Sequence, residues 1–403
     1  MTQFKFDPEA APSGARPVVA LRGSWREMGV QFGQCAREAV HANAAAAAAN
    51  AVKTRGSVEA ALGELPEYIE MTRAVFPQLV DCWQGIAEGA GLAPEYVYLT
   101  HITMAPPGEK SCSTVSAWGG ATAGGTLLCA VNADGTVRAN QYYPAVIAWP
   151  EDGHAFIAPL GLMTNTYLND AGLVVMASAG QNEKTPFAKA VPIMCAELYA
   201  AAFCAGAEEA AQSLIDGRMA GGGSNAHFAD SRGACIVEYT HGGYAVRRPG
   251  DHGERDYMIA ANHFLSEKMR GELFTGPHAW PDCPSRYRTE EAGILAGYGA
   301  HTPETLRALM AETRWLGENG VWADEWEPTR GEWTPENRGP GYKTYSRHVV
   351  DAAGRTMYVL AGSQQLPLSN IPDATGAFWA LRLEDSPEKC AAAAETALQS
   401  ELW

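Results

Sequence analysis

The first third of the chain is dominated by helical patterns that follow one short apolar run. Residues 17–22 (PVVALR) form that run, and the glycine after it predicts that a strand ends there. Ser24 and Glu27 have the spacing of a capping box, so we expect a helix over about 25–52. A second helical pattern covers 64–91 and is interrupted once by a proline. This segment is therefore predicted to be mainly helical.

Two glycines of the first predicted helix have a regular spacing. Gly29 and Gly33 are four residues apart, which places them on one face of the helix. Glycine lacks a Cβ atom, so this face favours the close approach of another element. Residues 106–108 (PPG) end the helical segment in a predicted loop.

From residue 112 onward the pattern changes to short apolar runs separated by turn residues. The single runs that predict strands are 113–118, 126–131, 145–149 and 172–177. Two pairs of runs flank turn residues and predict hairpins: 226–228 with 234–239, and 348–350 with 356–360. An alanine-rich pattern over 192–215 predicts one more helix, with its proline in the first turn. This order favours an α+β layered domain with mainly antiparallel sheets.

The net charge of the chain limits the kinds of macromolecule and surface that it is expected to bind. The chain has 403 residues, a formal net charge of −16 and a pI near 5.1. An acidic surface repels phosphate backbones and anionic lipids, so we expect no nucleic-acid partner and no membrane partner. No stretch has the length of a membrane span, and residues 1–17 do not resemble a secretory signal. The nine cysteines are an odd number without CxxC spacing, which favours reduced thiols and a cytoplasmic location.

A cysteine nucleophile needs a base, and the sequence offers two kinds. None of the ten histidines lies in a recognisable cysteine-protease signature. The second kind of base is the α-amine of a cysteine that begins a chain, because an α-amine has a pKa of about 7.7–8.0 and a thiol one of about 8.5. Such a cysteine arises when the precursor cuts itself: the thiol attacks the preceding carbonyl, and water hydrolyses the resulting thioester.

Several motifs resemble one known family in one consistent order over residues 17–310. They are LRGSWREMGVQFG at 21–33, GIAEGAG at 85–91, SCST at 111–114, GGTLLCAVNAD at 124–134, NDAGL at 169–173, ANHF at 261–264 and SRY at 285–287. Together they resemble the acyl-coenzyme A:6-aminopenicillanic acid acyltransferase family of self-processing N-terminal-nucleophile hydrolases. The resemblance implies an α+β fold, a four-layer αββα sandwich. It also implies a cut between Ser111 and Cys112, giving a small chain, 1–111, and a large chain, 112–403, in one globular domain.

The same resemblance implies the site residues. Cys112 would be the nucleophile and, through its amine, the base. Asn262 would donate to the oxyanion, and Asp134 would orient the site or hold the new ammonium. Arg286, with Ser285 beside it, would favour the thiolate and hold an acyl or carboxylate group.

The expected reaction is hydrolysis of a small N-acyl or peptide-like amide through a thioester acyl-enzyme, with no metal and no cofactor. The expected assembly is a homo-oligomer of processed heterodimers. Three alternatives stay open: transfer from an acyl-CoA to an amine, an unprocessed binding protein of the same fold, and a histidine-assisted cysteine hydrolase that needs no cut.

Each site residue also has a structural interpretation. Cys112 would be a core thiol, Asp134 a turn residue, Asn262 a strand-end cap and Arg286 a surface ion pair. Glu88 in the GIAEGAG motif is interpreted as a helix or packing residue rather than a catalytic acid.

Two positions depart from the family pattern. Ser111 stands where the family has glycine, which restricts the backbone at the expected cut. Ala133 replaces a tryptophan beside Asp134 and changes the wall of the expected pocket. The tryptophan-rich segment 315–345 has no counterpart and is predicted to be a long loop, with its tryptophans packing locally.

Overall fold

The computed structural model describes residues 18–102, 110–135, 143–180, 191–217, 223–240, 242–270, 283–312, 343–360 and 378–389. The helices are α1 (Trp25–Cys35), α2 (Arg37–Arg55), α3 (Val58–Val75), α4 (Pro77–Ala90), α5 (Pro94–Ile102), α6 (Ile193–Phe203), α7 (Ala207–Asp216), α8 (Glu267–Arg270), α9 (Cys283–Ala296) and α10 (Pro303–Glu312). A short 3₁₀ turn covers Gly119–Ala121. The expected tryptophan-rich loop lies almost wholly outside the described residues, because only its last three residues, 343–345, belong to a described strand.

The strands form two sheets. They are β1 (Val18–Gly23), β2 (Lys110–Ala117), β3 (Leu128–Gly135), β4 (Ala145–Pro150), β5 (Phe156–Ala158), β6 (Thr166–Asn169), β7 (Val174–Ala179), β8 (Ser224–Asp230), β9 (Gly233–Thr240), β10 (Gly243–Arg247), β11 (Tyr257–Ala260), β12 (Lys343–Asp351), β13 (Thr356–Leu360) and β14 (Phe378–Arg382). The first sheet has the order β1-β4-β5-β6-β7-β8-β9-β10, and the second has the order β11-β2-β3-β12-β13-β14. The pair β1–β4 is parallel, and the other ladders between described strands are antiparallel. The fold is therefore α+β, as the sequence predicts.

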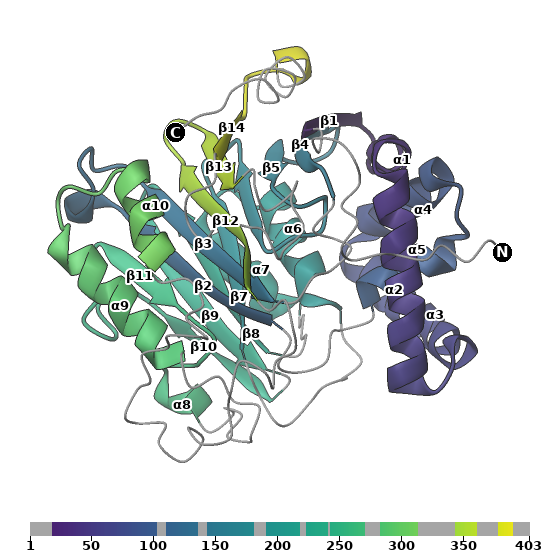
Figure 1. Ribbon diagram of the computed structural model, residues 1–403, viewed down its shortest axis with the longest axis horizontal. Coiled ribbons are helices and arrows are strands. Elements are labelled where there is room, and N and C mark those ends of the chain that lie inside the picture. Colours follow the sequence, from purple (N-terminus) through teal and green to yellow (C-terminus); the bar gives the residue numbers. More distant parts are fainter. Residues whose placement is uncertain are drawn as a thin grey trace.

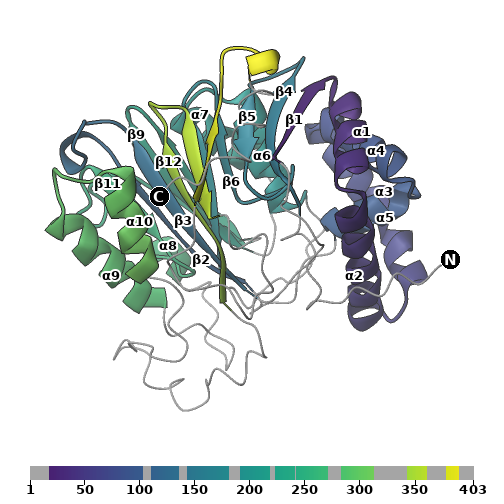
Figure 2. The same ribbon diagram turned by 45° about the horizontal axis from the view of Figure 1, so that its top comes forward.

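Three apolar clusters show how the elements pack. One lies between the sheets and includes Val131 and Val350 from the second sheet and Ile147 and Val174 from the first. A second joins helices α1 to α7 to the other face of the first sheet. A third joins α9 and α10 to the other face of the second sheet. Figures 1 and 2 show the N-terminal helices on one side of the two sheets and α9 and α10 on the opposite side.

The N-terminal helices are held together by contacts that need glycine. A Cβ atom at Gly29 or Gly33 of α1 would lie within 2.3 Å of a backbone oxygen of α4, and one at Gly85 or Gly89 of α4 within 2.2 Å of a backbone oxygen of α1. The predicted close approach at Gly29 and Gly33 is confirmed, and the GIAEGAG motif supplies its other half.

Two predicted helices are each two helices in the structure. The pattern over 25–52 breaks at Ala36, where φ is −107° and ψ is 23°, because α1 packs on α4 whereas α2 packs on α5. The pattern over 192–215 ends at Cys204 and resumes after Gly206.

The capping box of Ser24 and Glu27 is present, and both predicted hairpins form. Within the described ranges, no helix has both the length and the apolar character needed to cross a bilayer.

Candidate active site

Cys112 lies near the start of β2 and is 5% exposed. Across the ladder its partner on β3 is Ala133, and paired side chains of adjacent strands share a face. Val131, two residues along β3, belongs to the cluster between the sheets. Cys112 therefore points into the space between the two sheets, with only a small residue beside it on β3.

Three polar side chains from distant parts of the chain meet Cys112. Its backbone nitrogen donates to Oδ1 of Asn262 at 2.9 Å, and its carbonyl oxygen accepts from Nη1 of Arg286 at 2.8 Å. Nδ2 of Asn165 lies 3.9 Å from its Sγ. The sequence analysis named Asn262 and Arg286, and the structure brings both to Cys112. Each heteroatom of the cysteine thus has a polar side chain in contact with it.

Asn262 and Arg286 also contact each other. Nη2 of Arg286 donates to Oδ1 of Asn262 at 2.8 Å, so that oxygen accepts from both the guanidinium and the Cys112 nitrogen. Nδ2 of Asn262 donates to the carbonyl oxygen of Ala179 at 2.7 Å, at the end of β7. Both side chains are 2% exposed, which makes them neither a surface ion pair nor a solvent-facing cap. In this state Asn262 orients the Cys112 nitrogen, and its expected role at the oxyanion stays a prediction.

Asp134 lies beside the expected cleavage bond, on the other face of the second sheet from Cys112. It pairs with Ser111 across β2 and β3, one residue out of phase with Cys112. Side chains alternate along a strand, so Asp134 shares the face of Asn132, whose side chain donates to Met310 in α10. Asp134 is fully buried, in a strand rather than in a turn. Its expected role toward the new ammonium remains a prediction.

Asn165 is a site residue that was not expected from the sequence. This residue precedes β6, and its amide also donates to the carbonyl oxygen of Ala177 at 3.2 Å, which fixes it between two strands of the first sheet. The available signal was an amide residue at the end of the mainly apolar segment 160–165, just before a buried strand. The neighbouring Asn169 of the NDAGL motif has a structural role, because its side chain binds four backbone groups of a turn and of the end of α6.

Two other expected residues are partly outside the described part of the chain. Ser285 lies in α9, and Ser111 lies in β2 opposite Asp134, but the side chains of both serines are outside the described residues. Glu88 lies in α4 and forms an exposed ion pair with Arg26 at 2.9 Å.

Two buried histidines lie between the sheets on the same side as Cys112. His227 contacts the hydroxyls of Thr114 and Ser116 with its two ring nitrogens, at 3.0 and 2.8 Å. His348 contacts the hydroxyls of Thr166 and Ser346, the first at 3.2 Å. Burial lowers the pKa of each ring to about 3, so both are neutral. With both ring nitrogens engaged by hydroxyls, these two histidines link the sheets and are not placed as a base for the thiol.

The other described thiols are in different surroundings. Burial raises the pKa of Cys82 to about 12, and burial likewise raises that of Cys129. The described cysteines are all free thiols, and Cys283 at the start of α9 accepts from Arg286 at 3.3 Å. Among the described residues, no group of three or more His, Cys, Asp or Glu side chains is placed to bind a metal ion.

Comparison with known proteins gives matches among solved structures alone. No family model matches the chain, and no curated protein matches it. A penicillin V acylase from Agrobacterium tumefaciens is 16% identical with a TM-score of 0.40, covering 68% of this chain and 92% of that one. Two structures of a conjugated bile acid hydrolase from Clostridium perfringens, each of a single-residue variant, are 11% and 10% identical with TM-scores of 0.31 and 0.27. They cover 61% and 62% of this chain, and 88% and 81% of theirs. Similarity at these TM-scores does not assign a family.

Proposed function

We propose that this chain is a self-processing amidohydrolase whose nucleophile is Cys112, with the four-layer αββα fold of the N-terminal-nucleophile hydrolases. The observation that supports it is the convergence on one buried cysteine: Asn262 at its nitrogen, Arg286 at its carbonyl oxygen and Asn165 at its sulfur. Every buried backbone N–H and C=O needs a partner, but at Cys112 these partners are side chains 150 and 174 positions away in the chain, and a structural core thiol does not need an amide beside its sulfur as well.

The first reaction is the cut between Ser111 and Cys112. The Cys112 thiol attacks the carbonyl carbon of Ser111, and the C–N bond breaks as the amine leaves with a proton. A thioester then joins Ser111 to Sγ, and water hydrolyses it to a carboxylate and a free thiol. The nitrogen is already held by Asn262 before the cut, so the new amine forms in a fixed position. The products, 1–111 and 112–403, stay together because the cluster between the sheets contains residues of both.

Turnover uses the new amine as base. Its lone pair takes the thiol proton, and the thiolate attacks the carbonyl carbon of an amide substrate. An amide N–H of Asn165, which lies beside Sγ, stabilises the oxyanion that forms there, and the Nδ2 hydrogen of Asn262 that does not bind Ala179 is the second donor. The buried positive charge of Arg286, in contact with the Cys112 carbonyl, favours the thiolate over the thiol.

The proposed substrate is a small N-acyl or peptide-like amide, and water is the acceptor of the acyl group. Transfer of the acyl group from an acyl-CoA to an amine uses the same acyl-enzyme, so the two reactions differ only in what occupies the site when the thioester is attacked. The contacts at the Cys112 sulfur and carbonyl do not distinguish the two reactions, and hydrolysis is proposed first because it needs no second substrate besides water.

The test combines intact mass with an acyl screen. Purified protein is expected to give two fragments, the larger beginning with Cys112, and to hydrolyse members of a panel of N-acyl amino acids and N-acyl anilides. An acyl-CoA with an added amine, screened in parallel, separates transfer from hydrolysis. An uncut chain that hydrolyses the panel at full rate contradicts the amine-as-base mechanism, and an uncut, inactive chain supports the binding-protein alternative.

A further inference from the structure

A buried charged cluster lies next to the proposed site but does not touch Cys112 in any described contact. Its members are Arg247 at the end of β10, Glu238 in β9 and Glu254 in the loop before β11, and each is at most 1% exposed. Nη2 of Arg247 lies 2.6 Å from Glu254, and Nη1 lies 3.5 Å from Glu238. Burying three charges costs several kcal/mol per ion unless their geometry is well satisfied, so the arrangement calls for an explanation.

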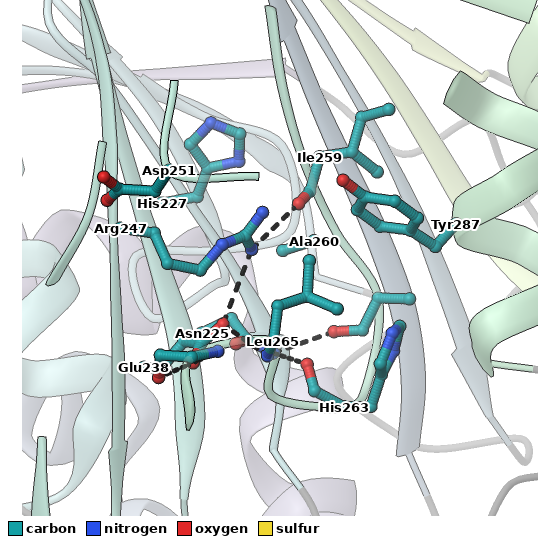
Figure 3. Close-up of polar contacts among 12 residues, drawn as sticks. Asn225, His227, Glu238, Arg247, Asp251, Ile259, Ala260, His263, Leu265 and Tyr287 are labelled. Atoms are coloured by element: carbon teal, nitrogen blue, oxygen red, sulfur yellow. Dashed lines mark hydrogen bonds and ion pairs between the residues drawn. The ribbon is translucent and has the colours of Figure 1, made fainter. Parts of the chain in front are cut away.

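One side of the cluster holds the segment that carries Asn262. The carboxylate of Glu238 accepts from the backbone nitrogens of Leu265 and Ser266, at 2.8 and 2.9 Å, and from the Ser266 hydroxyl. Nη1 of Arg247 donates to the carbonyl oxygen of Ile259 at 3.2 Å, on the other side of Asn262 along the chain (Figure 3). The segment that positions Asn262 is thus fixed at both ends.

A third side chain of the first sheet also holds this segment in place. Nδ2 of Asn225, in β8, donates to the carbonyl oxygen of Ala261 at 2.8 Å and approaches that of His263 at 3.5 Å (Figure 3). These are the two residues that flank Asn262. Its backbone therefore depends on side chains of β8, β9 and β10, which belong to the opposite sheet.

The other side of the cluster holds the helix that carries Arg286. Tyr287 follows Arg286 in α9, and its hydroxyl donates to Oε1 of Glu254 at 3.0 Å. The same Glu254 oxygen accepts from Arg247. A single guanidinium therefore connects the segment of Asn262 to the helix of Arg286. Its planar fork of donors reaches both carboxylates at once, which the single ammonium of lysine cannot do.

We propose that Arg247, together with Glu238 and Glu254, is the positioning unit of the Cys112 site: it sets where Asn262 and Arg286 stand relative to the Cys112 backbone. The inference rests on the proposed function. None of the three residues contacts the thiol in the described part of the chain. If they position the site, removing a single atom from the cluster lowers the rate of acyl transfer. A displacement of about 1 Å costs an enzyme about 10²-fold in rate.

Acyl transfer is measured with p-nitrophenyl acetate, whose kcat and KM follow from p-nitrophenolate release. Tyr287→Phe removes one hydroxyl, Glu254→Gln removes one charge, and Arg247→Lys removes the planar guanidinium. The matched controls are the same kinds of substitution at exposed residues, Tyr298→Phe and Arg248→Lys. We expect kcat to fall about tenfold or more in the three cluster variants, with KM within twofold, and to be unchanged in the controls. Alkylation of Cys112 by iodoacetamide, which needs the thiolate but no oxyanion donor, is expected to fall less than kcat in Tyr287→Phe.

Two outcomes overturn the proposal. One is a wild-type kcat in both Tyr287→Phe and Glu254→Gln. The other is a parallel fall of acyl transfer, alkylation and melting temperature, which shows a merely structural role.

A second measurement does not depend on activity. In the uncut Cys112→Ala chain, the residue-112 amide still donates to Asn262, so its hydrogen exchange reports the position of that side chain. Adding Tyr287→Phe is expected to speed this exchange at least fivefold over the Tyr298→Phe control, while amides of the β8–β9 hairpin stay unchanged. Equal rates at residue 112 overturn the proposal. An inactive wild-type protein with the expected exchange result rejects the proposed function and leaves the positioning unit supported.

Discussion

The backbone nitrogen of Cys112 donates a 2.9 Å hydrogen bond to Oδ1 of Asn262, 150 positions further along the chain. The contact forms because β11 lies beside β2 and ends at Ala260, which pairs with Thr114 and lies two residues before Asn262. The same oxygen accepts from Arg286, so one amide oxygen relates the strand of the nucleophile to helix α9. This relationship makes the Cys112 nitrogen, and not only its sulfur, part of the site.

Replacing Asn262 by alanine is expected to lower acyl transfer by about 10²–10³-fold, because one donor to the oxyanion and the anchor of the amine are lost together. The measurement is kcat/KM with p-nitrophenyl acetate on cut protein, together with the rate at which fragment 112–403 appears. Loss of both rates agrees with the two proposed roles. An unchanged kcat/KM assigns the oxyanion to other donors.

Cys112→Ala is expected to give a folded, uncut and inactive chain, because the variant lacks the thiol that both reactions need. Intact mass and a melting curve check it. Cys35→Ser is the matched control, since Cys35 is an exposed thiol on α1. That variant should be cut and active like the wild type, and normal turnover by Cys112→Ala would place the nucleophile elsewhere.

Arg286→Lys keeps the positive charge but loses the fork that binds the Cys112 carbonyl and Asn262 together. We expect kcat to fall about tenfold or more, as a lysine ammonium holds only one of the two acceptors in place. Arg288→Lys, at a neighbouring exposed residue, is the control, and its kcat should equal that of the wild type. A wild-type kcat in Arg286→Lys would show that charge alone is sufficient.

Acid is expected to destabilise the fold through its buried histidines. Burial lowers the pKa of His227, His263 and His348 to about 3, against 6.5 for an ordinary histidine. Between pH 6.5 and 3 the unfolded chain binds more protons than the folded one, so the free energy of unfolding falls as the pH is lowered. Each such histidine lowers the free energy of unfolding by up to about 1.4 kcal/mol for each pH unit of acidification in this range.

Denaturant unfolding at pH 7.0 to 4.5 measures this slope. His348→Gln should flatten this slope by the share of one histidine. Equal slopes in His348→Gln and wild type would show that His348 takes up no extra proton on unfolding.

Two helical glycines, one in the contact between α1 and α4 and one outside it, are predicted to respond in opposite ways to alanine. A Cβ atom at Gly89 would lie 2.1 Å from the carbonyl oxygen of Val30, so Gly89→Ala should lower the free energy of unfolding by about 3 kcal/mol or more. At Gly63, inside α3, nothing lies within 4 Å of such an atom. Gly63→Ala should therefore stabilise the protein by about 0.5–1 kcal/mol. Denaturant unfolding of both variants checks the pair, and a stable Gly89→Ala would contradict the packing.

Local features of the fold could be predicted from the sequence. The capping box at Ser24, the two hairpins and the paired glycines depend on residues within a few positions of each other, and the structure contains all of them. The break at Ala36 could not be predicted, because it follows from α1 and α2 packing on different helices.

At the site, the residues around Cys112 could be named from the sequence in part. The motifs selected Cys112, Asn262 and Arg286, but not Asn165, and no local pattern marks Arg247 as a buried link between them. The face on which Asp134 lies follows from strand register, since a shift of one residue reverses every side chain.

By itself, the sequence determined which chemical groups the chain carries and which short segments become helices, strands and turns. Only the tertiary structure decided that Asn165, Asn262 and Arg286 meet at one cysteine, and that a buried arginine connects two of them. The physical reason is the separation along the chain of the residues that interact. Caps and turns depend on hydrogen bonds between residues a few positions apart, whereas the contacts at Cys112 depend on strand pairing and sheet packing between segments that are far apart in the sequence.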